Sequence, residues 1–253
     1  MGLTGVMPDI VMKKPFANPY LLLLAGFCLL LTGRARAVDG PGDNVGIAID
    51  QVGVLVYPPS MLYAGVDSGE VRVVISVDAQ GKLTDSLVTG YTNEDFAKIS
   101  TAAIKRWKYQ PALSHGQARM SRAEVLFQFR DRGVIVQSLP GAQEHRMVAR
   151  VMGEPYVYAA CRLRELDQIP TPLHELEKPQ VNGDGRAHKV TVEFYIDEEG
   201  RTRMPAVDRG SADDLYAAAA VMAVEQWRFN PPLRKGRPAL VYAQQEFNFR
   251  PKE

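Results

Sequence analysis

The sequence contains little cysteine, with only Cys28 and Cys161 in a chain of 253 residues. Cys28 lies in an N-terminal segment that we expect to be removed, so the mature chain keeps one cysteine and cannot form an intrachain disulfide. The fold must therefore depend on hydrophobic burial. We interpret Cys161 as a small buried apolar residue, and a reactive thiol is the alternative.

The sequence has no large excess of charge of either sign. Its formal net charge is +1, and without residues 1–37 it would keep 26 basic and 28 acidic side chains, a net charge of −2. Proteins that bind nucleic acid need a strongly basic surface. The composition therefore argues against nucleic acid as a partner.

The N-terminal apolar run is too short to span a bilayer comfortably. It extends from Tyr20 to Leu31, follows the basic start Met12-Lys13-Lys14, and precedes Ala35-Arg36-Ala37, a small-x-small cleavage pattern. We predict a signal peptide over residues 1–37, with Met12 as the candidate true start. The mature protein is then periplasmic and has no membrane span. The alternative is an uncleaved anchor in the inner membrane.

Common catalytic and cofactor motifs are also missing. The four histidines have no metal-ligand spacing. The sequence has no glycine-rich phosphate-binding pattern and no serine in a nucleophile-elbow context. We therefore expect neither an enzyme nor a bound cofactor or metal.

What the sequence does contain is a repeat of about 120 residues. Both copies carry Asp-x-x-Gly, then a glycine, Trp-Lys/Arg-aromatic-x-Pro, a second glycine and Phe-x-Phe-Arg. The first copy has Asp78, Gly81, Gly90, Trp107, Pro111, Gly116, Phe127 and Phe129, and the second has Asp197, Gly200, Gly210, Trp227, Pro231, Gly236, Phe247 and Phe249. The Asp-x-x-Gly motifs lie 119 residues apart, and the offset is a constant 120 from Gly90 onward, which indicates a duplicated domain.

Each copy predicts the same order of elements. Alternating β-branched residues over 71–77 and 190–196 indicate strands with one buried face. Asp-x-x-Gly turns the chain into a second strand, and a helix with an apolar stripe follows, ending near a tryptophan that we interpret as a core anchor. A third strand carries Phe-x-Phe. Pro205 predicts an edge or a bulge in the second copy.

The predicted fold class is α+β, with two tandem small domains. Each is a three-stranded antiparallel sheet with a helix packed on one face, in the order β-β-α-β, with a short helix before the first strand as an option. The predicted segments are a lead-in over 38–55, domain 1 over 56–130, a partly structured linker over 131–166, and domain 2 over 167–253. We note an extra strand as an option for Gly133–Gln137.

This arrangement resembles the C-terminal domain of the TonB energy-transducer family. The matching features are Tyr-Pro before the first strand, the Val-x-Val-Asp-x-x-Gly hairpin, the helix ending in Trp-Lys/Arg-aromatic-x-Pro, and the final Phe-x-Phe. The resemblance implies a protein-binding module that captures an extended segment of an envelope or outer-membrane protein by strand addition.

By position, the resemblance assigns partner binding to the last strand of each copy. The residues carried over are Glu124, Leu126 and Gln128 in the first copy and Glu246 and Asn248 in the second. An ordinary solvated strand face is the other interpretation. If only one copy binds a strand, we expect it to be the first, because the last strand of the second copy is more polar.

The chain also departs from the family. Full transducers keep a membrane helix followed by a long proline-rich spacer, whereas here a cleavage pattern follows a short apolar run. We therefore expect a binding protein that does not transmit force. The alternative function is a structural or assembly protein of the envelope, whose paired domains self-associate into a homodimer.

Overall fold

The computed structural model of the protein describes residues 44–51, 53, 55–114, 116–130, 133–139, 156–174, 176, 179, 181, 186–207 and 214–249. The predicted signal peptide lies outside these residues. Gly40–Glu253 form one compact unit, which contains both repeats.

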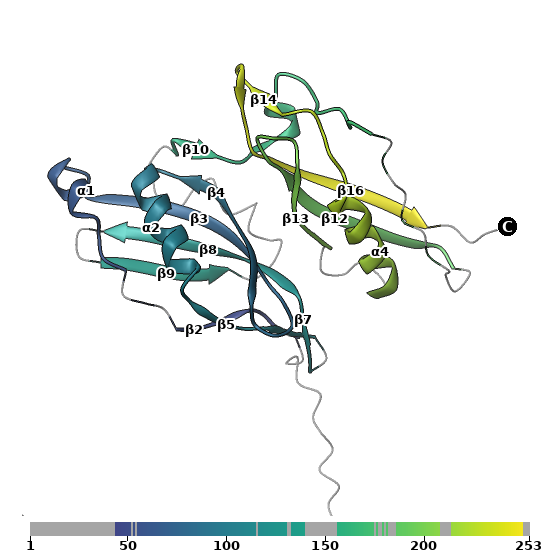
Figure 1. The fold of residues 1–253 in the computed structure, drawn as a ribbon, viewed down its shortest axis with the longest axis horizontal. Helices are drawn as coiled ribbons and strands as arrows, with labels where there is room; N and C mark the ends of the chain where they lie inside the picture. The colour runs from purple at the N-terminus through teal and green to yellow at the C-terminus, as the bar shows by residue number, and fades with distance from the viewer. Residues whose placement is uncertain are drawn as a thin grey trace, which may run out of the picture. The chain divides into compact units, whose positions relative to one another are not determined.

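The first repeat is built on a five-stranded antiparallel sheet (Figure 1). In spatial order its strands are β10 (Tyr158–Ala159), β4 (Leu83–Tyr91), β3 (Ser68–Val77), β8 (Ser121–Arg130) and β9 (Gly133–Leu139). The helix α2 (Glu94–Ile104) packs on one face. The short helix α1 (Pro59–Tyr63) precedes β3, so the optional helix is present in the first repeat. The remaining strands are β1 (Asn44–Val45), β2 (Ala48–Gln51), β5 (Lys108–Gln110), β6 (Ala112–Ser114) and β7 (Gln117–Arg119).

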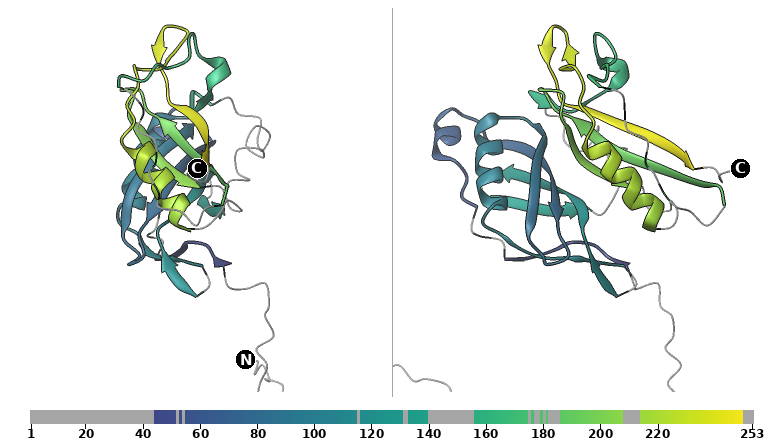
Figure 2. Two further views of the ribbon diagram at one scale, coloured as in Figure 1. Left: turned by 90° about the vertical axis from the view of Figure 1, so that its right-hand side faces the viewer. Right: turned by 45° about the vertical axis from the view of Figure 1, so that its right-hand side comes forward.

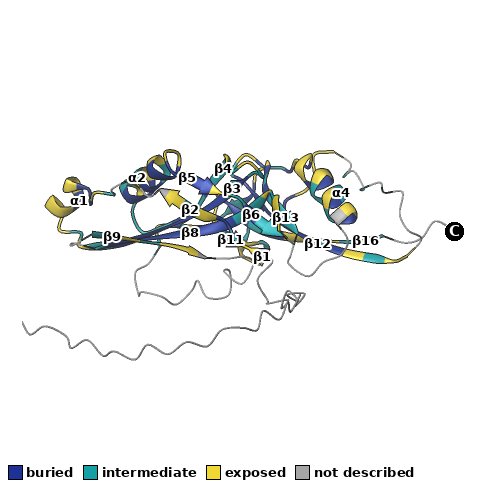
Figure 3. Cartoon of the chain, turned by 90° about the horizontal axis from the view of Figure 1, so that it is seen from below, coloured by how far each residue is buried: buried dark blue, intermediate teal, exposed yellow. Residues whose placement is uncertain are grey.

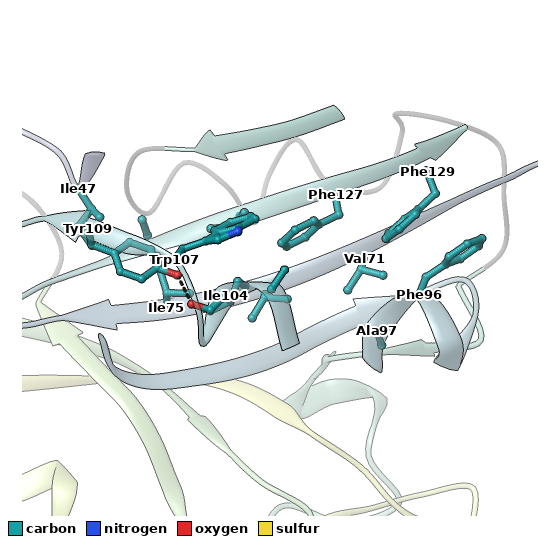
Figure 4. Packing of buried hydrophobic residues seen from close by; sticks show 14 of the residues in the cluster. Ile47, Val71, Ile75, Phe96, Ala97, Ile104, Trp107, Tyr109, Phe127 and Phe129 are labelled. Atoms are coloured by element: carbon teal, nitrogen blue, oxygen red, sulfur yellow. Dashed lines mark hydrogen bonds between the residues drawn. The ribbon is translucent and has the colours of Figure 1, made fainter. Parts of the chain in front are cut away.

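The core of the first repeat lies between α2 and the sheet (Figure 4). The Phe96 ring stacks on Phe129 at 4.3 Å between centroids, and Trp107 stacks on Phe127 at 5.5 Å. The Tyr109 hydroxyl donates to the Ile104 carbonyl at the end of α2, at 2.8 Å. Trp107 is thus a buried core residue, which confirms its interpretation as an anchor.

The second repeat has a four-stranded sheet with α4 (Asp214–Glu225) across one face (Figure 2). Its strands, in spatial order, are β11 (Cys161–Arg162), β16 (Val241–Phe249), β12 (His188–Ile196) and β13 (Thr202–Val207). The smaller elements are the 3₁₀ turn η1 (Leu163–Glu165) and the hairpin of β14 (Leu233–Arg234) with β15 (Arg237–Pro238). Cys161 is 2% exposed, and burial raises the pKa of its thiol, so the buried apolar interpretation is confirmed.

Both Asp-x-x-Gly segments form the predicted tight turns. Asp78 Oδ1 accepts the N–H groups of Gln80 and Lys82 at 2.9 and 2.8 Å, and Gly81 has φ of +80°. Asp197 accepts the N–H of Arg201 in the same way, at 2.8 Å. The aspartate therefore satisfies the backbone donors of the turn, and the glycine supplies the positive φ that it requires.

Pro205 lies where its sequence context predicts. It belongs to β13, which is an edge strand of its sheet. The pairing register with β12 shifts between Glu193 and Tyr195, and Met204 has φ of +53°. Both the edge and the bulge are therefore present. Proline has no backbone N–H group, so it fits an edge strand or a bulge better than a strand paired on both sides.

The segment predicted as a partly structured linker adds strands to both sheets. It contributes β9 and β10 to the first sheet and β11 to the second, the last parallel to β16. The optional strand at Gly133–Gln137 is confirmed and extends to Leu139. As a consequence β8 is an interior strand, so neither of its sides is free for the strand addition that the resemblance implies.

The two repeats contact each other through sheet faces that carry no helix. Val74 and Leu87 of the first repeat cluster with residues of the second, namely Tyr195, Met204 and Leu240. Arg203 Nη2 lies 2.6 Å from Asp85 Oδ1. Arg122 donates through Nη2 to Glu193 Oε2 at 2.9 Å and through Nη1 to the Met204 carbonyl at 2.7 Å. The repeats are therefore joined by apolar packing and by charged groups.

Candidate functional site

In the first repeat, the edge predicted to bind a partner is covered by the chain itself. β8 pairs with β3 on one side and with β9 on the other, from Glu124 opposite Leu139 to Arg130 opposite Gly133. Only residues 131 and 132 connect the two strands, a loop length typical of a β-hairpin. The chain thus supplies its own added strand at this edge.

The predicted residues of β8 lie on the face opposite α2 and are buried. Glu124, Leu126 and Gln128 are 2%, 5% and 7% exposed. Gln128 Nε2 donates to Glu70 Oε1 at 3.0 Å, and the Arg72 guanidinium lies 3.8 Å from Glu124. A solvated face, the other interpretation, is therefore wrong for this strand in the first repeat.

Tyr156 covers part of this polar face and was not identified from the sequence. Its hydroxyl donates to Glu70 Oε2 and accepts from Arg72 Nε, both at 2.8 Å, and its ring lies 5.5 Å from the Arg72 guanidinium carbon. Gly90 leaves room for the ring, because a Cβ at residue 90 would lie 3.0 Å from it. Tyr156 therefore fixes the residues just before β10 against the first sheet.

Burial dominates the electrostatics of this face. It raises the pKa of the Glu124 carboxyl, although Arg72, Thr89 and Arg122 act in the opposite direction. Burial also raises the pKa of the Tyr156 phenol to about 12. These groups are enclosed by the fold, which gives them a structural role.

In the second repeat, most of the corresponding edge is not covered by any described strand. β16 pairs with β12 along its whole length, from Val241 to Phe249. On its other side the parallel strand β11 pairs only with Val241 and Tyr242. Within the described part of the chain, residues 243–249 therefore form an open edge.

The predicted residues Glu246 and Asn248 lie on this open stretch and are exposed. Figure 3 shows that β16 carries exposed residues along this stretch. Glu246 pairs with Lys189 Nζ at 2.7 Å and accepts from Asn248 Nδ2 at 3.2 Å. The hydrogen bond from Lys189 lowers the pKa of the Glu246 carboxyl. This carboxylate thus remains charged at the edge over the physiological pH range.

The direction of the backbone groups on β16 follows from its first residues. The Cys161 N–H donates to the Leu240 carbonyl at 2.9 Å, on the side where β11 lies. In a strand, the backbone groups of alternate residues point to opposite edges. The N–H and C=O groups of Gln244, Glu246 and Asn248 are therefore directed at the open edge.

Side-chain burial reflects the same difference between the two edges. Phe127 and Phe129 are fully buried, and Val134 and Val136 of β9 pack against their cluster. Their counterparts Phe247 and Phe249 are only partly buried. The second repeat therefore presents incompletely covered aromatic rings beside backbone groups that pair with no described strand.

The sequence did carry a signal for β9, because Gly133–Gln137 reads as a strand and follows β8 after two residues. Such a spacing favours pairing with the preceding strand.

Among the described residues, no helix is long and apolar enough to cross a membrane. Within the same ranges, no group of His, Cys, Asp and Glu side chains is arranged to hold a metal ion.

Comparisons with known proteins agree with the duplicated fold. The sequence model of the family described as "Gram-negative bacterial TonB protein C-terminal" matches residues 54–130 and 183–251. Protein TonB from two strains of Xanthomonas campestris pv. campestris, B100 and ATCC 33913, is 32% identical over 89 residues, which are 35% of this chain. The chain spans 40% of the length of these relatives. The chain belongs to the TonB C-terminal family, and it carries the family's domain twice.

Proposed function

We propose that this protein is a periplasmic binding module that captures extended segments of envelope proteins by strand addition at the open edge of β16. The observation that carries the proposal is the stretch from Ala243 to Phe249, which pairs with β12 on one side and with no described strand on the other. An extended peptide can satisfy the outward backbone groups there. The family and the predicted signal peptide support the compartment.

The proposal assigns different roles to the two repeats. β9 occupies the edge of β8, so the first repeat has no free site there unless β9 leaves. Its helix-free face holds the second repeat instead, through Val74, Leu87, Arg122 and Asp85. The second repeat is thus the better candidate for binding, which reverses the sequence-based expectation.

Two neighbouring proline substitutions test the proposal. Glu246→Pro removes a backbone donor that points to the open edge, whereas Gln245→Pro removes one that points to β12. We expect the Glu246→Pro chain to stay folded and to lose its partners in a pull-down from an envelope fraction. The Gln245→Pro chain should lose stability in urea, because it breaks the sheet.

Undiminished capture by a folded Glu246→Pro chain would refute β16 as the binding edge. Sedimentation of the purified chain tests the alternative function. If the edge of β16 instead pairs with that of a second copy, the wild-type chain will be a dimer, and Glu246→Pro will convert it to a monomer.

A further inference from the structure

We infer that β9 is an internal counterpart of the ligand. The ligand of β16 is then an antiparallel strand that carries two aliphatic residues at alternate positions and a small polar residue two positions after the second. Read from its N-terminus, the pattern is aliphatic-x-aliphatic-x-polar, as in Val134-x-Val136-x-Ser138. This inference rests on the proposed function and specifies the chemistry of the peptide.

The pairing of β8 with β9 supplies the template. Val136 lies opposite Phe127, and Val134 lies opposite Phe129. Both valines belong to the α2 side of the sheet and pack against its core. In this arrangement both phenylalanine rings are fully buried. The valines thus complete an apolar layer that β8 alone would leave open.

The same register can be transferred to β16 because the repeat is constant from Gly90 onward. Phe247 corresponds to Phe127 and Phe249 to Phe129, and both lie on the α4 side of their sheet. Each is partly buried. An antiparallel strand with aliphatic side chains opposite these two rings would bury them as β9 buries their counterparts.

The third position distinguishes the second repeat from the first. Gln245 lies where the first repeat has the fully buried Val125, and it is exposed. The residue of β9 opposite Val125 is Ser138. In the free chain Gln245 Nε2 donates to the Glu246 carbonyl at 2.8 Å, and an added strand would take that carbonyl. A small polar residue opposite Gln245 can then hydrogen-bond with the released amide, whereas a valine would cover the amide without satisfying it. The ligand is therefore expected to be polar at this position.

The positions between these three carry no such requirement. Ile135 and Gln137 are exposed on the other face of β9. The residues of β16 that would lie opposite them, Asn248 and Glu246, are exposed as well. Substitutions at these positions of a peptide should therefore have small effects on affinity.

A peptide that copies Gly133–Leu139, blocked at both ends, tests the inference on the full isotope-labelled chain. We expect it to protect the amides of Gln244, Glu246 and Asn248 from hydrogen exchange. The peptide with Val134→Ser and Val136→Ser should bind at least about tenfold more weakly. The peptide with Ile135→Ser, the matched control, should bind within about twofold of the original.

A swap at the third position makes the test more specific. The peptide with Ser138→Val should bind the wild-type chain more weakly than the original peptide does. It should regain affinity for the Gln245→Val chain, since a valine pair replaces the polar pair. If this rescue fails, the assignment at the third position is wrong.

The remaining outcomes separate this inference from the proposed function. If peptides bind at β16 but the two valines prove dispensable, the pattern is wrong and strand addition stands. If the peptide perturbs β8 and releases β9, the ligand site lies in the first repeat and the inference fails. If envelope peptides and the copied peptide all leave the β16 amides unprotected, the proposed function falls as well.

Discussion

Gly81 and Gly200 join the two most recognisable motifs of each repeat. A Cβ on Gly200 would lie 1.9 Å from the Phe229 carbonyl oxygen, and one on Gly81 would lie 2.5 Å from the Tyr109 carbonyl oxygen. The Phe229 N–H also donates to the Gly200 carbonyl at 2.8 Å. The Asp-x-x-Gly turn and the Trp-x-aromatic segment recur together because the backbone of one passes directly over the other.

Gly200→Ala is therefore expected to lower the free energy of unfolding by about 3 kcal/mol or more, since it combines positive φ with a backbone clash. Gly236→Ala is the matched control. Gly236 has φ of +72° and no heavy atom within 4 Å of a built Cβ, so its replacement should cost about 1 kcal/mol. Urea unfolding measures both. Equal losses would mean that the close approach at Gly200 is unimportant.

Glu124 gives a prediction about pH. Burial raises the pKa of this carboxyl, so the folded chain holds the proton more tightly than the unfolded chain. Its contribution to stability is fully present below the ordinary pKa of 4.5 and is lost as pH rises through the raised value. The free energy of unfolding can be measured in urea between about pH 4 and 8. Glu124→Gln should remove this part of its pH dependence. An unchanged profile would contradict the assignment.

At the level of elements, β9 is expected to stabilise the first repeat by covering β8. Val136→Ser should lower the free energy of unfolding by about 1–2 kcal/mol, because it uncovers Phe127. Ile135→Ser, on the exposed face of the same strand, should cost less than about 0.5 kcal/mol. Hydrogen exchange of the Leu126 amide should become faster in the first variant only. Equal effects of the two substitutions would mean that β9 is not packed on the core.

The elements that the sequence predicts are those with their own periodicity. The alternation in β3 and β12, the apolar stripe of α2 and the aspartate turns are local, so each can be read from one window of residues. β10 and β11 are two residues long and carry no period, and they join sheets formed by distant strands. Strand addition at β8 was misjudged, because β9, which covers that strand, lies outside the repeat.

At the level of the whole molecule, a largely buried ion pair joins the two repeats. The side chains of Arg122 and Glu193 are 14% and 5% exposed, and Arg122 also caps the Met204 carbonyl. Arg122→Ala would leave the Glu193 carboxylate buried with one partner fewer, so we expect a loss of about 3 kcal/mol. The thermal unfolding transition of this variant should also separate into two steps, one for each repeat.

The control for this prediction is Lys189→Ala, which removes an ion pair of comparable length between exposed side chains. It should leave the transition almost unchanged, because exposed pairs are screened by solvent. Calorimetry can follow both variants. A single transition of unchanged midpoint in the Arg122→Ala chain would show that the interface does not couple the repeats.

The central claim is that β9 closes the last strand of the first repeat, whereas no described strand covers most of the last strand of the second. Amide hydrogen exchange of the free, full chain tests it most directly. We predict strong protection at Glu124, Leu126 and Gln128, whose outward groups meet β9, and fast exchange at Gln244, Glu246 and Asn248. Equal protection of the two sets would contradict the claim, and so would protection confined to β16.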